Sequence, residues 1–177
     1  HQLGYKIFYL YNPKSNEFLY FLPYFMKLTK KSLTVFYSGR STNGNQGIEF
    51  INGSVSRGIL GEIIARNCTG SPRIMFITDC IGGGSVFDIN YSDRENKFHQ
   101  SNMISFFVRK VYSPQSKKSK RSHGICTYYF SKITNECPNI TTNRLIERMN
   151  PSICRFDEVF VCEVTNLDLA DQPIFSD

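Results

Sequence analysis

The sequence predicts an α/β fold in which helices cover both faces of a mostly parallel central sheet. Runs with strand composition alternate along the chain with stretches in which apolar residues have helical spacing. One strand-like run, residues 33–37, is almost wholly apolar, as expected where both faces of a sheet are covered. Helical stretches between strands favour parallel crossovers. The length of 177 residues fits one domain, which we assign to residues 1–177.

Strands are expected where short runs rich in aromatic and β-branched residues are bounded by turn-forming residues. Asn12-Pro13 ends the first run, and a polar loop over residues 41–47 follows the second. The dipeptide Asn52-Gly53, which follows an apolar run, is typical of a small hairpin turn. The expected strands of the sheet are residues 5–10, 33–37, 73–78, 103–110 and 158–164.

Helices are expected where apolar residues gather on one face of a helical repeat. Ser56 is a typical N-cap, and Pro151 is expected to stop the last helix. Pro23 should kink the first helix or set its true start, because proline lacks a backbone donor. The expected helices are residues 16–31, 57–67, 127–134 and 142–150, the last one capped by Thr141 or Thr142.

Charge and hydropathy exclude several classes of partner. The net charge of +6 is moderate, and no basic stripe with interleaved aromatic residues supports nucleic-acid binding. No apolar run approaches the roughly 20 residues that span a bilayer, and no signal peptide is visible. We therefore expect neither a nucleic acid nor a membrane among the partners.

Part of the positive charge lies in one short run within residues 113–123. Flanking Ser, Pro and Gln residues indicate an exposed loop. The loop is either solvated without a further role, a contact for an acidic partner, or a cleavage site for a trypsin-like enzyme. Its basic residues are Lys117, Lys118, Lys120 and Arg121.

The six cysteines do not have the spacing of a metal site. None forms a Cys-x-x-Cys pair, and they are not dense enough for a secreted module stapled by disulfides. We expect no metal and no cofactor, and a cytoplasmic or otherwise intracellular setting, where thiols stay reduced. The cysteines stand at positions 68, 80, 126, 137, 154 and 162.

Candidate site residues directly follow two of the predicted strands. Residues 38–40 (Ser-Gly-Arg) follow one, and a glycine-rich stretch, residues 79–85 (Asp-Cys-Ile-Gly-Gly-Gly-Ser), follows the other. In parallel sheets, sites gather at the carboxyl ends of neighbouring strands. The glycines alone would also fit tight turns. No Gly-Lys-Ser/Thr follows them, which argues against a phosphate-binding loop.

These two segments resemble the catalytic segments of the caspase and metacaspase cysteine peptidases. In that family the first segment ends in Ser-Gly-His, and the second carries Asp-x-Cys-x-Ser-Gly. Residues 84–88 (Gly-Ser-Val-Phe-Asp) align without a gap with the family's Ser-Gly-Ser-x-x-Asp stretch. Residues 124–127 (Gly-Ile-Cys-Thr) resemble its small-subunit Gly-x-x-Thr, and residues 173–175 (Pro-Ile-Phe) its terminal Pro-x-Phe. The resemblance covers roughly residues 4–175.

The resemblance implies a three-layer caspase-like sandwich. Residues 1–112 then correspond to the large subunit, residues 113–123 to a basic loop, and residues 124–177 to the small subunit. The family usually has a strand and a helix ahead of the segment like residues 4–10, for which this chain has no room. Either they were removed, or the sheet is one strand short, or something else covers that edge. The start at His1 also suggests a piece of a larger protein.

Both catalytic positions of the family carry other residues in this chain. Arg40 stands in place of the histidine, and Ile81 in place of the cysteine. The peptidase mechanism needs a thiol nucleophile that an imidazole activates. Isoleucine has no nucleophilic atom, and arginine keeps its proton at neutral pH and cannot accept another. Because the paired groups act as a unit, either change should be disabling, and we expect no catalytic residue.

Two residues near the nucleophile's place keep other roles open. Cys80 lies one position early, so along an extended strand its side chain turns to the opposite face. The alternative function is an active cysteine endopeptidase that cuts after Arg or Lys with Cys80. The resemblance implies that Asp79, beside Ser38 and Gly39, helps to form a pocket for a basic side chain. Arg40 either pairs with Asp79 and fills that pocket, or points to solvent.

The sequence therefore favours a catalytically inactive caspase-like domain that acts as a binding or regulatory module. Its expected partner is a protein or peptide, and the resemblance extends this to an active caspase-like relative. The last strand, residues 158–164, is a candidate contact for a homodimer, as the closing strand is in caspases. Metacaspases are generally monomeric, so the family leaves the oligomeric state open.

Overall fold

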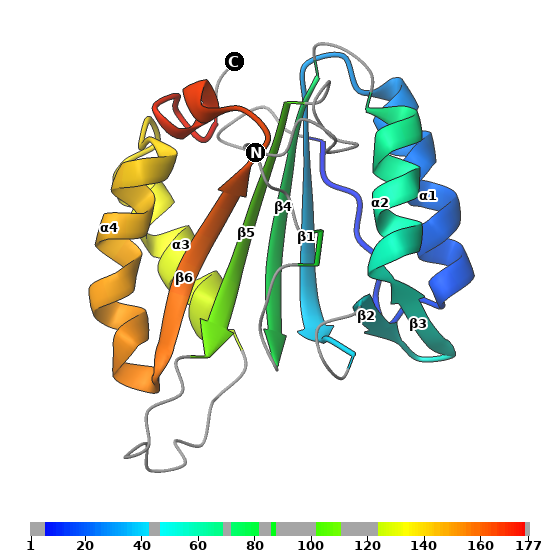
Figure 1. Ribbon diagram of the computed structural model, residues 1–177, viewed down its shortest axis with the longest axis horizontal. Helices are drawn as coiled ribbons and strands as arrows, with labels where there is room; N and C mark the ends of the chain where they lie inside the picture. The colour runs from blue at the N-terminus through cyan, green and yellow to red at the C-terminus, as the bar shows by residue number, and fades with distance from the viewer. Residues whose placement is uncertain are drawn as a thin grey trace.

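The computed structural model describes residues 6–42, 47–68, 72–81, 86–87, 102–110 and 124–175. Their centre is a four-stranded sheet with the strand order β1-β4-β5-β6 (Figure 1). β1 (Ser32–Arg40), β4 (Arg73–Ile81) and β5 (Asn102–Lys110) run parallel, and β6 (Glu158–Val164) is antiparallel to β5. The mostly parallel sheet that the sequence predicts is confirmed.

Two pairs of helices lie on opposite sides of this sheet (Figure 1). α1 (Ser15–Leu28) and α2 (Arg57–Asn67) form one pair, and α3 (Ile125–Glu136) and α4 (Thr142–Ile153) form the other. Within the part of the chain that the structure describes, no helix is long and apolar enough to cross a membrane.

The strand β4 lies at the centre of both hydrophobic cores. Ile74 and Phe76 belong to the cluster under α1 and α2, whereas Met75 and Ile77 belong to the cluster under α3 and α4. Alternate side chains of a strand point to opposite faces, so a strand covered by helices on both sides is apolar at successive positions. This burial explains the composition of residues 73–78.

A hairpin of β2 (Gly47–Phe50) and β3 (Gly53–Ser56) precedes α2, as predicted. The turn lies one residue earlier than expected, because Phe50 pairs with Gly53 and leaves residues 51–52 as the loop. Ser56 is the N-cap of α2, and its hydroxyl accepts a hydrogen bond from the Ile59 amide at 3.3 Å. Two short 3-10 helices, η2 (Cys154–Phe156) and η3 (Leu167–Ala170), flank β6.

The strand predicted at residues 5–10 is wrong over residues 6–10, which have no regular secondary structure. Phe8 packs on α1 instead, with ring centroids 4.8 Å from Phe21 and 4.9 Å from Phe25. Ile7 and Tyr9 are exposed on either side of it. A strand needs hydrogen-bonding partners on a neighbouring strand, and the sheet supplies none to this segment.

Two helix ends also differ from the prediction. α1 runs through Pro23 and ends at Leu28, three residues before the predicted end, because β1 already begins at Ser32. α4 passes Pro151 and continues to Ile153, so that proline does not stop the helix. Thr141, one of the two predicted caps, accepts a hydrogen bond from the Arg144 amide.

Candidate functional site

The two segments singled out in the sequence lie side by side at the carboxyl ends of β1 and β4. These strands are parallel and in register over nine residue pairs. Arg40 is the partner of Ile81 at the last pair, and Ser38 is the partner of Asp79 two pairs earlier. The two positions that the resemblance aligns with a catalytic dyad are thus neighbours across adjacent strands.

Asp79 caps the amino-terminal end of α3. Its side chain is only 4% exposed, and Oδ2 accepts hydrogen bonds from the Thr127 amide at 3.0 Å and the Thr127 hydroxyl at 2.6 Å. The first amides of a helix have no partner within the helix, and Gly124, the N-cap of α3, has no side chain to offer them. The carboxylate therefore joins β4 to α3, and it also complements the positive end of the helix dipole.

Of the two alternatives for Arg40, an ion pair with Asp79 or a side chain that points to solvent, the structure favours the second. Arg40 is exposed, and the described residues contain no ion pair that joins it to Asp79. The register gives a reason, because Asp79 lies opposite Ser38 and its Oδ2 already accepts from Thr127. Ser38 is likewise exposed at this edge.

Cys80 is buried on the other face of the sheet. It is 4% exposed, and its strand partner is Gly39. The pKa of Tyr37 is raised to about 12, chiefly by burial and to a smaller extent by the charge of nearby Cys80. Tyr37 packs against the core under α1 and α2, whereas Asp79 binds α3. The side chains of β4 thus alternate between the two faces of the sheet through Cys80, as the sequence predicts. In this conformation a substrate cannot reach the buried Cys80 thiol.

Tyr37 explains the glycine of the first segment. Its hydroxyl donates to the carbonyls of Arg40 at 3.0 Å and of Glu49 at 2.5 Å. A Cβ atom at Gly39 would lie 2.5 Å from the same hydroxyl oxygen. Gly39 is therefore required by the packing of Tyr37, a role that sequence reasoning missed. The available signal is the spacing, since residues two apart on a strand share a face.

Several predicted site residues lie outside the described residues. They include the glycine run and Ser85 of the second segment, and the four basic residues of the loop. Beyond the glycines, Val86 and Phe87 are described and buried, and the Phe87 ring lies 4.5 Å from that of Phe76 between centroids. The segment after β4 thus returns to the core under α1 and α2.

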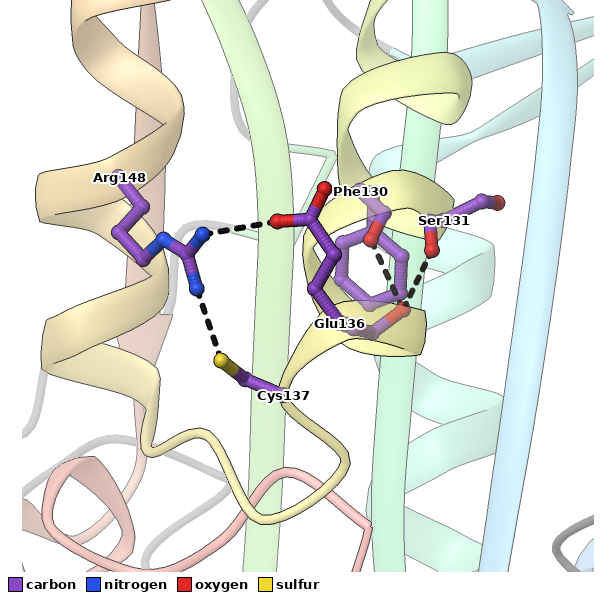
Figure 2. Close-up of polar contacts among 6 residues, drawn as sticks. Phe130, Ser131, Glu136, Cys137 and Arg148 are labelled. Atoms are coloured by element: carbon purple, nitrogen blue, oxygen red, sulfur yellow. Dashed lines mark hydrogen bonds and ion pairs between the residues drawn. The ribbon is translucent and has the colours of Figure 1, made fainter.

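A polar cluster at the far end of α3 was not predicted from the sequence (Figure 2). Arg148 of α4 reaches Glu136 at 2.9 Å and the Cys137 sulfur at 2.9 Å. On α3 itself, the Thr134 hydroxyl donates to the carbonyls of Phe130 and Ser131. The contacts of Arg148 fasten α4 to the end of α3.

No group of three or more His, Cys, Asp or Glu side chains that could hold a metal ion occurs in the described ranges. No family model matches the chain, and no curated protein matches it either. The likeness to caspases and metacaspases therefore rests on the motifs of the sequence alone.

Proposed function

We propose that this protein is a caspase-like domain without peptidase activity, which acts as a binding or regulatory module. One observation carries the proposal: Arg40 and Ile81 are register partners at the ends of two neighbouring parallel strands. A nucleophile and its base must lie within hydrogen-bond reach, so adjacent strand ends suit such a pair. Arginine and isoleucine supply neither group.

The burial of Cys80 argues against the alternative, a peptidase that uses this thiol. A nucleophile must meet its substrate, and Cys80 is 4% exposed, near Tyr37, on the face opposite Asp79. To expose the Cys80 thiol, the end of β4 would have to separate from β1, where Cys80 pairs with Gly39.

The proposed binding region is the exposed edge at the carboxyl ends of β1 and β4. Ser38 and Arg40 are both exposed there, and Arg40 offers its guanidinium to a carboxylate of a protein or peptide segment. The described contacts of Asp79 serve α3, so we do not assign it to a pocket for a basic side chain. An active caspase-like relative is one partner of the proposed kind.

A thiol-reactive peptidyl probe that ends in arginine tests both the lack of peptidase activity and the resemblance to caspases. The unmodified protein should not be labelled. Labelling that is lost in Cys80→Ala and kept in Cys154→Ala, a variant at an exposed cysteine, would establish the alternative peptidase. The double variant Arg40→His/Ile81→Cys should gain a reactive thiol that the single variants lack.

The pH dependence of iodoacetamide labelling makes that gain measurable. A free thiol titrates near pH 8.5, and a thiol paired with an imidazolium titrates at about 3.5–7.5. A neighbouring arginine also lowers a thiol pKa, so the reference variant is Arg40→Ala/Ile81→Cys. Labelling of Arg40→His/Ile81→Cys should have its midpoint at least about 1 pH unit below that of the reference. Equal midpoints would mean that the two positions do not form a dyad, and the caspase-like assignment would fail.

The binding role is tested with a photoreactive amino acid at position 38. In an extract of the source cell, crosslinks should form from Ser38 at the proposed edge, and Arg40→Glu should reduce them. The control is the same group at Glu147, which is exposed on α4. Equal crosslinking from the two positions would contradict a binding site at the strand ends.

A further inference from the structure

The two edges of the sheet are protected differently. β6 and β1 are the outer strands of the order β1-β4-β5-β6, and Figure 1 shows them at opposite ends of it. On β6, the Phe160 amide donates to the side-chain oxygen of Asn150 on α4 at 2.8 Å. A backbone donor of that edge is therefore already used inside the molecule. Edges blunted in this way resist pairing with another chain.

In the described part of the chain, β1 has no such protection along its middle. Within the described ranges, β4 is the only strand that pairs with it, and all nine of its residues are half-buried or exposed. It contains no proline, and its single charge, Arg40, stands at its end. Phe36, at the centre of the strand, is 47% exposed. An open edge with a central aromatic side chain is suited to receive another strand.

We propose that two copies of this chain pair through the edge of β1. Residues 34–38 of the two copies run antiparallel about a twofold axis at Phe36, and the two four-stranded sheets become one continuous sheet. A twofold contact must be self-complementary, since each residue meets its equivalent or exchanges places with another. This inference does not rest on the proposed function, but Ser38 belongs to both the paired segment and the proposed binding edge. Crosslinks from position 38 to a second copy of the chain therefore count for the dimer and not for the binding role.

The sequence of β1 meets this condition. With Phe36 opposite its own copy, Val35 faces Tyr37, and Thr34 faces Ser38. None of these side chains is charged, so no like charges oppose one another. Sliding the axis to Arg40 would bring two guanidinium groups together, which disfavours that register. The resemblance to caspases makes residues 158–164 a candidate contact for a homodimer, whereas the Asn150 bond on β6 favours the β1 edge instead.

The test measures the mass of the full chain by sedimentation and light scattering over a range of concentrations. The protein should sediment with twice its mass of 20.4 kDa. Phe36→Lys and Phe36→Glu should each raise the dimer dissociation constant at least about tenfold, because like charges then meet at the axis. An equimolar mixture of the two variants should restore the dimer, since Lys then faces Glu.

Ile51→Lys is the matched control, because Ile51 is an exposed apolar residue on the hairpin turn, away from the middle of β1. It should leave the dimer intact, and circular dichroism should show that all three variants are folded. A monomer at about 100 μM, a range typical of weak association, would overturn the proposal. So would a Phe36→Lys dimer of unchanged affinity, or a mixture of the two charged variants that stays monomeric.

Discussion

The replacement Asp79→Ala measures how much the cap of α3 contributes to the fold. Asp79 is 4% exposed and accepts two hydrogen bonds from Thr127. Its removal leaves a backbone amide and a hydroxyl without this partner, and each unsatisfied buried group costs about 1–3 kcal/mol. We therefore expect the free energy of unfolding to fall by about 2–5 kcal/mol. For a chain of this size, about 2–4 °C per kcal/mol gives a melting temperature lower by about 4–20 °C.

The assay is urea unfolding followed by far-ultraviolet circular dichroism. Asp79→Asn keeps an acceptor oxygen and should lose less than Asp79→Ala. Thr127→Val removes the hydroxyl but keeps the amide bond, so it should cost about 1–2 kcal/mol. If the two residues act together, Asp79→Ala/Thr127→Val costs less than the sum of its parts by at least about 0.5 kcal/mol.

Asp168→Ala is the control, because Asp168 is an exposed acid near the start of η3. It should change the free energy of unfolding by less than about 0.5 kcal/mol. An equally small effect of Asp79→Ala would refute the assignment of Asp79 as a structural cap. Strict additivity in the Asp79–Thr127 cycle would refute it as well, because the bond would then contribute nothing measurable.

Two further variants follow from the burial of thiols and from the packing around Tyr37. Burial raises the pKa of Cys68 from 9.0 to about 11. The unfolded chain therefore releases this proton first, and stability should fall by up to about 2–3 kcal/mol from pH 9 to 11. Urea unfolding in reductant should show that decline, and Cys68→Ala should reduce its slope. The slope that remains belongs to other buried groups such as Cys162, whose pKa burial also raises. An unchanged slope in Cys68→Ala would exclude Cys68 as a cause. Gly39→Ala should cost about 1–3 kcal/mol in the same assay, because the new Cβ displaces the Tyr37 hydroxyl from two carbonyls. No loss of stability in Gly39→Ala would contradict that packing.

Features that depend on neighbouring residues were predictable from the sequence. The Ser56 cap of α2 and the hairpin before it follow from local hydrogen bonding and turn chemistry. The strand expected at residues 73–78 is present and buried. The strand expected at residues 33–37 is also present, but the prediction that it is covered on both faces is wrong, because β1 is an outer strand of the sheet and these residues are half-buried or exposed. For the features predicted correctly, the information lies within a few residues of the element.

Features that depend on distant partners were not predictable in the same way. Residues 6–10 have strand composition, but whether they form a strand depends on a neighbour that pairs with them. Pro151 stands inside α4 because Met149 and Ile153, both fully buried, hold the helix against the core on either side of it. Tertiary packing thus outweighs the local effect of the proline.

The same distinction between local and distant partners applies to the candidate site. Parallel topology places the ends of β1 and β4 together, so the proximity of their segments could be inferred from sequence. The partner of Asp79 could not, because Thr127 lies 48 residues further along the chain and both Arg40 and Thr127 were chemically reasonable partners. Only the three-dimensional arrangement decides between an ion pair and a helix cap.

The residues that match the proposed family motif and those that depart from it differ in what they do for the fold. Asp79 holds the end of α3 through Thr127, and Gly39 leaves room for Tyr37. Replacing either should disturb packing, whether or not the protein cuts peptides. Arg40 is exposed, so a change from histidine to arginine at that position disturbs little of the core. Under the proposed function, loss of the dyad removes the chemistry, while the residues that hold β1, β4 and α3 together remain as a scaffold for binding.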